Sequence, residues 1–228
     1  MTHFDAGLDV FLTGATGYLA AGLLPALAHR GHRLRALARP YSERRVPSEA
    51  QVIVGDPLFG DSYREAVRAG DTFVHLVGTP RPAPWKAPSF ERVDLGSVRE
   101  AVRVALSAGV AHFVYVSVAQ PAPVMKSYVA ARRAAEDLLV ASGLRATILR
   151  PWYVLGPGHR WPHLLRPLYA LAARVPTLAE SARRLGLVRR EDLTAAVVAA
   201  VEGPPKGRVT VVDVSGILAA GRAWVGRC

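Results

Sequence analysis

The stretch DVFLTGATGYLA, residues 9–20, decides the fold prediction. Its first five residues suit a buried strand, glycines follow at positions 14 and 17, and a helical pattern then runs from residue 18 to residue 30. Gly14 can make the tight turn, and Gly17 leaves room for a pyrophosphate over the helix N-terminus. Ala20 stands where helix and strand pack. This order predicts a phosphate-binding loop, and the alternative is an ordinary strand-to-helix turn.

The same alternation continues along the chain, because short apolar runs separate longer stretches of helical period as far as Val214. Strands are predicted at residues 9–13, 33–38, 51–54, 72–77, 112–116, 145–149 and 208–212. Helices are predicted at residues 18–30, 62–69, 97–108, 126–142, 161–173 and 191–202, with a kink at Pro25. The pattern predicts an α/β fold, a Rossmann-type doubly wound parallel sheet whose ligand crevice lies at the carboxyl ends of the strands.

Length and composition favour one domain over residues 1–228, with a small C-terminal cap at residues 156–191. No apolar run reaches the roughly 18 residues that a membrane span needs, and no secretory signal is visible, so a cytoplasmic location is predicted. The lone Cys228 excludes an intrachain disulfide and a multi-cysteine metal site. His159 and His163 have metal-ligand spacing but no nearby carboxylate, so no metal site is predicted.

The net charge of +11 comes mainly from arginine. The arginines are spread in ones and twos, without a block or an aromatic-interleaved run, which favours solvated faces and small anionic ligands. A small-molecule substrate is therefore predicted and a nucleic-acid partner is not. The oligomeric state stays open.

Several segments, taken together, resemble the atypical and extended short-chain dehydrogenase/reductase superfamily, the group of NAD(P)-dependent epimerase/dehydratase-like and NAD(P)H-binding proteins. Residues 10–20 resemble its TGATGYLG opening. Further matches follow in order at residues 55–56 (GD), 74–78 (VHLVG), 113–117 (FVYVS), 142–144 (SGL), 147–151 (TILRP) and 156–158 (GPG). The resemblance covers residues 10 to 159 and implies a bound pyridine dinucleotide.

The resemblance also implies which residues hold that cofactor. The pyrophosphate loop comprises Gly14, Thr16, Gly17, Tyr18 and Leu19. Asp56 is expected by the adenine, and the nicotinamide half is expected along Gly78 and the segment from Pro151 to Val154.

Arg39, at the end of the second predicted strand, bears on the choice of cofactor. A site for NAD(H) places an acidic residue near this point to hold the ribose 2′-hydroxyl, whereas a guanidinium suits a 2′-phosphate. Arg44 and Arg45 are candidate helpers. We therefore expect NADP(H) in preference to NAD(H), the alternative being that Arg39 is simply a solvated arginine.

The catalytic residues that the resemblance implies are only partly present. Tyr128 and Arg132 share one helix face at i, i+4, where the family has Tyr and Lys. Tyr128 is the candidate acid/base, with a half-buried packing residue as the alternative, and Arg132 is the candidate ribose-holding cation. Val118 stands where the family has a catalytic hydroxyl. Ser117, one residue earlier, points to the other face of an extended chain and so cannot simply substitute unless the strand has already ended.

Two functions follow from these residues. The first is an NADP(H)-binding short-chain dehydrogenase/reductase-like protein that reduces a carbonyl or enone of a small organic substrate. The alternative is a catalytically inactive NAD(P)H-binding redox sensor or assembly factor, favoured by the changes at positions 118 and 132.

Overall fold

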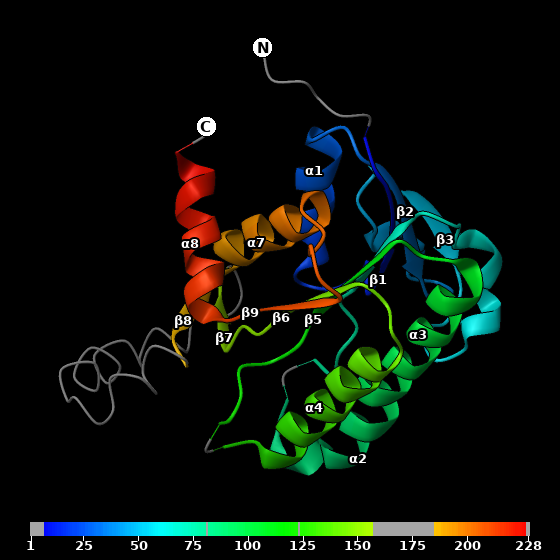
Figure 1. Ribbon diagram of the computed structural model, residues 1–228. Helices are drawn as coiled ribbons and strands as arrows, with labels where there is room; N and C mark the ends of the chain where they lie inside the picture. Colours follow the sequence, from blue (N-terminus) through cyan, green and yellow to red (C-terminus); the bar gives the residue numbers. More distant parts are fainter. Residues whose placement is uncertain (1–6, 81, 123, 157–184, 227–228) are drawn as a thin grey trace.

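A seven-stranded parallel sheet forms the centre of the computed structural model, which describes residues 7–80, 82–122, 124–156 and 185–226 (Figure 1). The strand order is β3-β2-β1-β4-β5-β6-β9. These strands are β1 (Asp9–Thr13), β2 (Arg33–Ala38), β3 (Gln51–Val54), β4 (Thr72–His75), β5 (His112–Val116), β6 (Ala146–Leu149) and β9 (Val209–Val212). The chain runs outward from β1 to β3 and then returns to β4, so the doubly wound prediction is confirmed.

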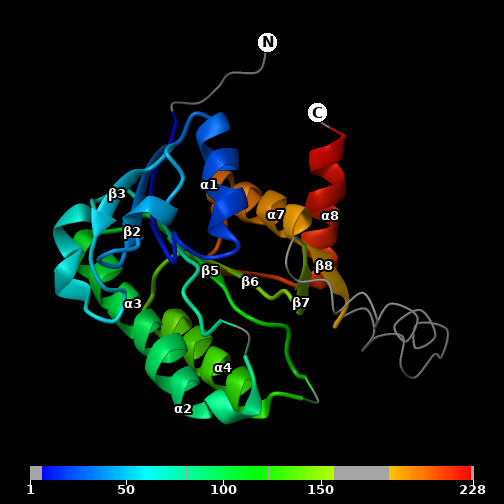
Figure 2. The ribbon, with the colours of Figure 1, turned by 180° about the vertical axis from the view of Figure 1, so that it is seen from behind.

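Helices cover both faces of this sheet (Figures 1 and 2). One face carries α1 (Ala20–His29), α7 (Arg190–Glu202) and α8 (Val214–Val225), and the other carries α2 (Ala87–Ser89), α3 (Gly96–Ala108) and α4 (Lys126–Ala141). Because both faces are covered, the central strands are apolar throughout, and alternate residues enter two separate cores. Within β5, for example, Val114 and Val116 face the α1 side while Phe113 and Tyr115 face the α3 side.

A second, two-stranded sheet pairs β7 (Tyr153–Leu155) with β8 (Leu187–Arg189) in parallel. The sequence pattern did not predict either strand, because each has only three residues and lies outside the main alternation. Most of the expected cap, residues 157–184, lies outside the described residues, as do the predicted helix 161–173 and the histidine pair. The division into domains therefore stays a prediction.

Three predicted elements need correction. The helix predicted at 62–69 is wrong, since short 3-10 turns at Gly60–Ser62 and Arg64–Ala66 stand there, broken by the extended φ of −139° at Tyr63. The strand predicted at 72–77 ends at His75, and the Leu76 backbone that follows lies against Gly14 of the glycine loop. The helix predicted at 18–30 runs from Ala20 to His29, and the kink expected at Pro25 inside it stays a prediction. The final helix, α8, was not predicted.

The segment before α3 is helical in short pieces. A 3-10 turn, η4 (Pro84–Lys86), leads through α2 into η5 (Phe90–Leu95), a π-helical turn that joins α3. Such turns add a residue to a helix and occur often at functional sites. Here the turn carries Asp94 into the interior, where its side chain is fully buried.

Among the described residues, none of the helices is long and apolar enough to span a membrane. The same part of the chain holds no group of three or more side chains that could ligate a metal. The cytoplasmic location stays a prediction.

Candidate functional site

The glycine loop between β1 and α1 has the geometry that close approach of a ligand to backbone requires. Gly14 has a φ of +80°, and a Cβ there would stand 2.8 Å from the carbonyl carbon of Leu76, so only glycine fits. The amide of Gly17 donates to the Gly14 carbonyl over 3.0 Å, which closes the turn. No side chain caps α1, which leaves the N-terminal end of the helix accessible to an anion. These residues fit a diphosphate.

Tyr18, in the same loop, connects it to the second sheet. The guanidinium carbon of Arg190 lies 5.3 Å from the centre of the Tyr18 ring, and a Cβ on Gly156 would stand 1.9 Å from the phenolic oxygen. Burial raises the pKa of Tyr18. Leu19 is partly buried against the core between α1 and the sheet. The glycine loop is therefore held by Tyr18 against the segment around β7 and β8 and by Leu19 against the core.

The predicted adenosine side lies at the carboxyl ends of β2 and β3. Arg39 is exposed directly after β2, and Arg45 donates to the carbonyl of Thr16 over 3.0 Å, which ties this segment to the glycine loop. Asp56 lies nearby, since the preceding Gly55 donates its amide to Ala38 at the end of β2. The carboxylate of Asp56 accepts from the amide of Leu58 over 2.9 Å and so shapes its own turn.

Arg132 is almost fully buried at the carboxyl end of β5. Its guanidinium donates to the hydroxyl of Tyr115 and to the carbonyl of Val116, each over 3.1 Å, and forms an ion pair of 2.8 Å with Asp94. The Nε atom is buried without a hydrogen-bond partner among the described residues. A Cβ on Gly78 would stand 2.0 Å from a terminal nitrogen of Arg132, so this glycine makes room for the guanidinium.

Asp94 is the site residue that the sequence analysis missed. Its carboxylate holds Arg132 and accepts from the hydroxyl of Thr79 over 2.6 Å and from the Thr79 amide over 3.2 Å. A buried charge is tolerated when it is paired and hydrogen-bonded in this way. The sequence feature that could have indicated a buried Asp94 is its position between the apolar residues Val93 and Leu95, just ahead of an amphipathic helix.

Tyr128 lies on the same face of α4 as Arg132, as its spacing predicted. Its ring centre is 5.3 Å from the guanidinium carbon of Arg132 and packs edge-on against Phe90 at 5.1 Å. The side chain is half-buried. Ser117 and Val118 are both buried just beyond β5, and the Ser117 hydroxyl has no hydrogen-bond partner within the described segments.

A chain of buried polar groups lies behind this centre. His75, the last residue of β4, contacts the Thr13 hydroxyl through Nδ1 at 2.8 Å and the Ser97 hydroxyl through Nε2 at 3.2 Å. Burial, and secondarily the charge of Arg132, lowers the pKa of His75 to about 3. The imidazole is therefore neutral near pH 7, and its contacts link β1, β4 and α3.

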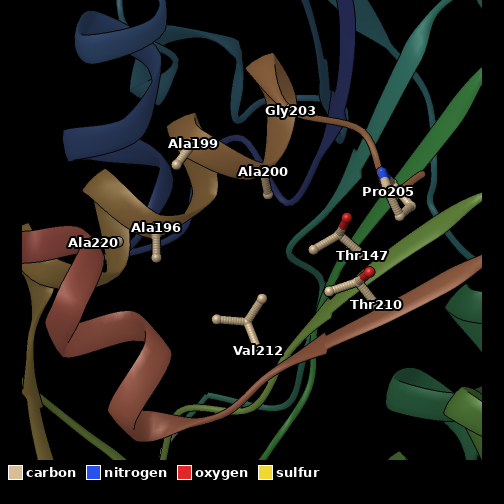
Figure 3. A pocket seen from close by; sticks show the side chains of 9 residues that line it. All are labelled: Thr147, Ala196, Ala199, Ala200, Gly203, Pro205, Thr210, Val212 and Ala220. Carbon is tan, nitrogen blue, oxygen red and sulfur yellow. The ribbon is translucent and has the colours of Figure 1, made fainter. Parts of the chain in front are cut away.

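Two cavities lie outside the candidate site. One of about 190 Å³ lies between α7, α8 and the strands β6 and β9, with the threonine hydroxyls at 147 and 210 on neighbouring strands facing small apolar side chains (Figure 3). The other, of about 470 Å³, adjoins β7 and β8 and is lined by Leu155, Gly156, Leu187, Arg189, Glu191, Asp192 and Leu218. Neither is lined by the glycine loop or by Tyr128.

The predicted site residues share one edge of the sheet. The glycine loop follows β1, Arg39 and Asp56 follow β2 and β3, and Gly78 follows β4. Pro151 follows β6, where its carbonyl accepts from the Ala119 amide over 2.8 Å, and Val154 lies on β7. Direct contact joins Gly78, Tyr128 and Arg132, whereas the adenosine-side residues form a separate group. The whole edge suits an extended ligand with a diphosphate at its middle.

Known proteins share this arrangement. A family model described as NAD(P)H-binding matches residues 14–164. Ceramide reductase of Caulobacter vibrioides is 32% identical over 212 residues, covering 92% of this chain and 66% of that protein. A 3-diazoavenalumate denitrifying reductase of a Streptomyces species is 28% identical over 233 residues, covering 90% and 76%. This chain therefore spans slightly less than two thirds of the length of ceramide reductase.

Solved structures agree on the fold. The Bordetella bronchiseptica enzyme WbmH, determined in complex with NAD+, matches with a TM-score of 0.68 at 20% identity, over 90% of this chain and 75% of that one. UDP-glucuronic acid 4-epimerase of Bacillus cereus, in complex with NAD, matches with a TM-score of 0.66 at 16% identity, over 90% and 77%. Since the family model covers the glycine loop, Tyr128, Arg132 and the strands between them, the chain belongs to the NAD(P)H-binding family of atypical short-chain dehydrogenase/reductase-like proteins.

Proposed function

We propose that this protein is an NADP(H)-dependent reductase that acts on a carbonyl or enone of a small organic substrate. One observation carries the proposal: Tyr128 and the buried cation Arg132 lie 5.3 Å apart, ring centre to guanidinium carbon, beside Gly78 in a chain of the NAD(P)H-binding family. A phenol beside a fixed positive charge is a suitable proton donor, because the charge stabilises the phenolate that remains.

The residues divide the work between them. When bound, a pyridine dinucleotide would supply the hydride that the substrate carbon accepts, and the phenol of Tyr128 would give a proton to the substrate oxygen. Arg132 holds a positive charge near the phenol, and its unpartnered Nε–H is the donor left for a ribose hydroxyl. The glycine loop binds the diphosphate, Asp56 lies by the adenine, and Pro151 to Val154 border the nicotinamide half.

A preference for NADP(H) is supported by the basic groups after β2. Arg39 is exposed there, with no acidic residue in the position that would hold a 2′-hydroxyl, and Arg45 is fixed against the glycine loop. We expect Arg39→Glu to weaken NADPH binding by about tenfold or more through lost ion pairing, with little effect on NADH. Fluorescence titration with both coenzymes measures this. Arg99→Glu, an exposed arginine on α3, is the matched control.

Equal affinity of the unaltered protein for NADPH and NADH would contradict the preference. Absence of binding to either coenzyme would contradict the proposed function itself.

Catalysis is tested with NADPH and a panel of carbonyl compounds. The names of two relatives, ceramide reductase and 3-diazoavenalumate denitrifying reductase, direct the panel toward ketone analogues of ceramides and toward aromatic substrates. We expect Tyr128→Phe to lower turnover about 100-fold or more, since it removes the proton donor, while NADPH affinity stays unchanged. Turnover that survives this substitution would exclude Tyr128 as the acid.

The second candidate function is a catalytically inactive NAD(P)H-binding sensor or assembly factor. It is favoured by Val118, which offers no hydroxyl, and by the contacts of Arg132 with Asp94, Tyr115 and Val116, which already use most of its donors. Tight NADPH binding without turnover of any compound in the panel would support this candidate over the reductase.

A further inference from the structure

Tyr41 is a large aromatic residue that contributes nothing to the packing of the fold. It follows Arg39 and Pro40 at the carboxyl end of β2, and its side chain is fully exposed. Most exposed apolar side chains are unremarkable, but a tyrosine ring usually buries at least its edge against the protein surface.

The backbone of Tyr41 is in a conformation that its side chain disfavours. The amide of Ser42 donates to the carbonyl of Arg39 over 3.0 Å, which closes a four-residue turn with Pro40 second and Tyr41 third. Tyr41 has a φ of +66°, in the left-handed region that glycine or asparagine usually occupies at the third position of such a turn. Strained residues of this kind cluster at ligand-binding sites, so the outlier calls for a functional reason.

The surroundings of Tyr41 indicate what the ring meets. Arg39, Arg44 and Arg45 are all exposed within four residues of it, and the Arg45 guanidinium is bonded to the Thr16 carbonyl of the glycine loop. The turn therefore lies beside the end of the crevice where the adenosine half of a dinucleotide belongs. An exposed aromatic face among exposed arginines, one of them bonded to the glycine loop, suits a flat, electron-rich base attached to phosphate.

We propose that Tyr41 is an adenine-stacking residue, held outward by its strained turn so that the ring binds the base of the pyridine dinucleotide. The proposal rests on the proposed function, because it assumes that a dinucleotide occupies the crevice. It separates two tasks on this side of the site: the arginines recognise the 2′-phosphate, and Tyr41 recognises the base that NADPH and NADH share.

The test is a set of binding measurements that needs no substrate. Tyr41→Ala should weaken the affinity for NADPH, for NADH and for adenosine 2′,5′-bisphosphate by about 5- to 100-fold, the range for loss of one base-stacking contact. Tyr41→Phe keeps the ring and should stay within about twofold of the unaltered protein. Nicotinamide mononucleotide, which lacks adenine, should bind all variants equally. By contrast, Arg39→Glu should affect NADPH much more than NADH.

A further variant separates binding from folding. Tyr41→Gly removes the ring and also relieves the positive φ, so its thermal unfolding temperature should equal or exceed that of the unaltered protein while its affinity falls as in Tyr41→Ala. The proposal is overturned if the unaltered protein binds NADPH and Tyr41→Ala binds it within twofold. It is also overturned if Tyr41→Phe loses as much affinity as Tyr41→Ala. Failure of the unaltered protein to bind any dinucleotide would instead refute the proposed function.

Discussion

Single residues at the carboxyl end of β5 show how a buried charge is accommodated. Arg132 stands where the family resemblance implies a lysine, and its planar guanidinium needs a counter-ion, which Asp94 provides, and free space, which Gly78 provides. The resemblance identified position 132. It could not identify Asp94, because that contact depends on how a π-helical turn packs against α4.

This pair leads to a stability prediction. Asp94→Asn leaves the buried guanidinium of Arg132 without a counter-ion, so we expect the free energy of unfolding to fall by about 3–5 kcal/mol. The matched control is Asp61→Asn, which breaks the exposed 3.0 Å pair with Arg103 and should cost less than about 1 kcal/mol. Urea denaturation measures both. Similar costs for the two variants would show that burial does not strengthen the Asp94 contact.

At the scale of elements, the sequence pattern correctly predicted strands and helices whose formation depends on neighbouring residues. The five-residue β1 and the sixteen-residue α4 were located to within a residue, because their composition, spacing and flanking glycines agree. The segment at residues 62–69 looked helical only in composition, and its tyrosine is drawn into the core instead. The pair β7 and β8 joins residues more than thirty positions apart, which no local pattern can reveal.

The candidate site follows the same division. The glycine loop and Arg39 are predicted from their places after predicted strands, and Tyr128 is predicted from the family resemblance. The tie from Arg45 to Thr16 and the strained turn at Tyr41 required coordinates. The sequence thus predicts candidate ligand-binding residues more readily than the contacts that hold those residues in place.

At the scale of the whole molecule, buried histidines make folding depend on pH. Burial, followed by the charge of Arg132, lowers the pKa of His75 to about 3, so the folded state keeps it neutral while the unfolded chain protonates below about pH 6.5. Because the unfolded state binds the extra proton, stability falls as the pH drops through the window between these values. His112, whose pKa burial lowers to about 4, acts in the same direction.

We therefore expect the contribution of His75 to lower the free energy of unfolding by about 2 kcal/mol when the pH falls from 7 to 5. Urea denaturation of His75→Asn at both values should show a smaller difference than the unaltered protein, even if the variant is less stable overall. His29→Asn, at an exposed position on α1, is the control and should leave the slope as it is. A slope unchanged in His75→Asn would mean that this ring is not the proton-sensitive group.

The contact between Tyr18 and Gly156 has a consequence for how this protein can vary. The phenolic oxygen occupies the space that any larger residue at 156 would need, although the two positions lie far apart along the chain. A larger side chain can replace Gly156 only if a smaller side chain replaces Tyr18. A mutational survey would accordingly record an epistatic pair, in which a change that is deleterious alone becomes tolerable once its companion has been trimmed.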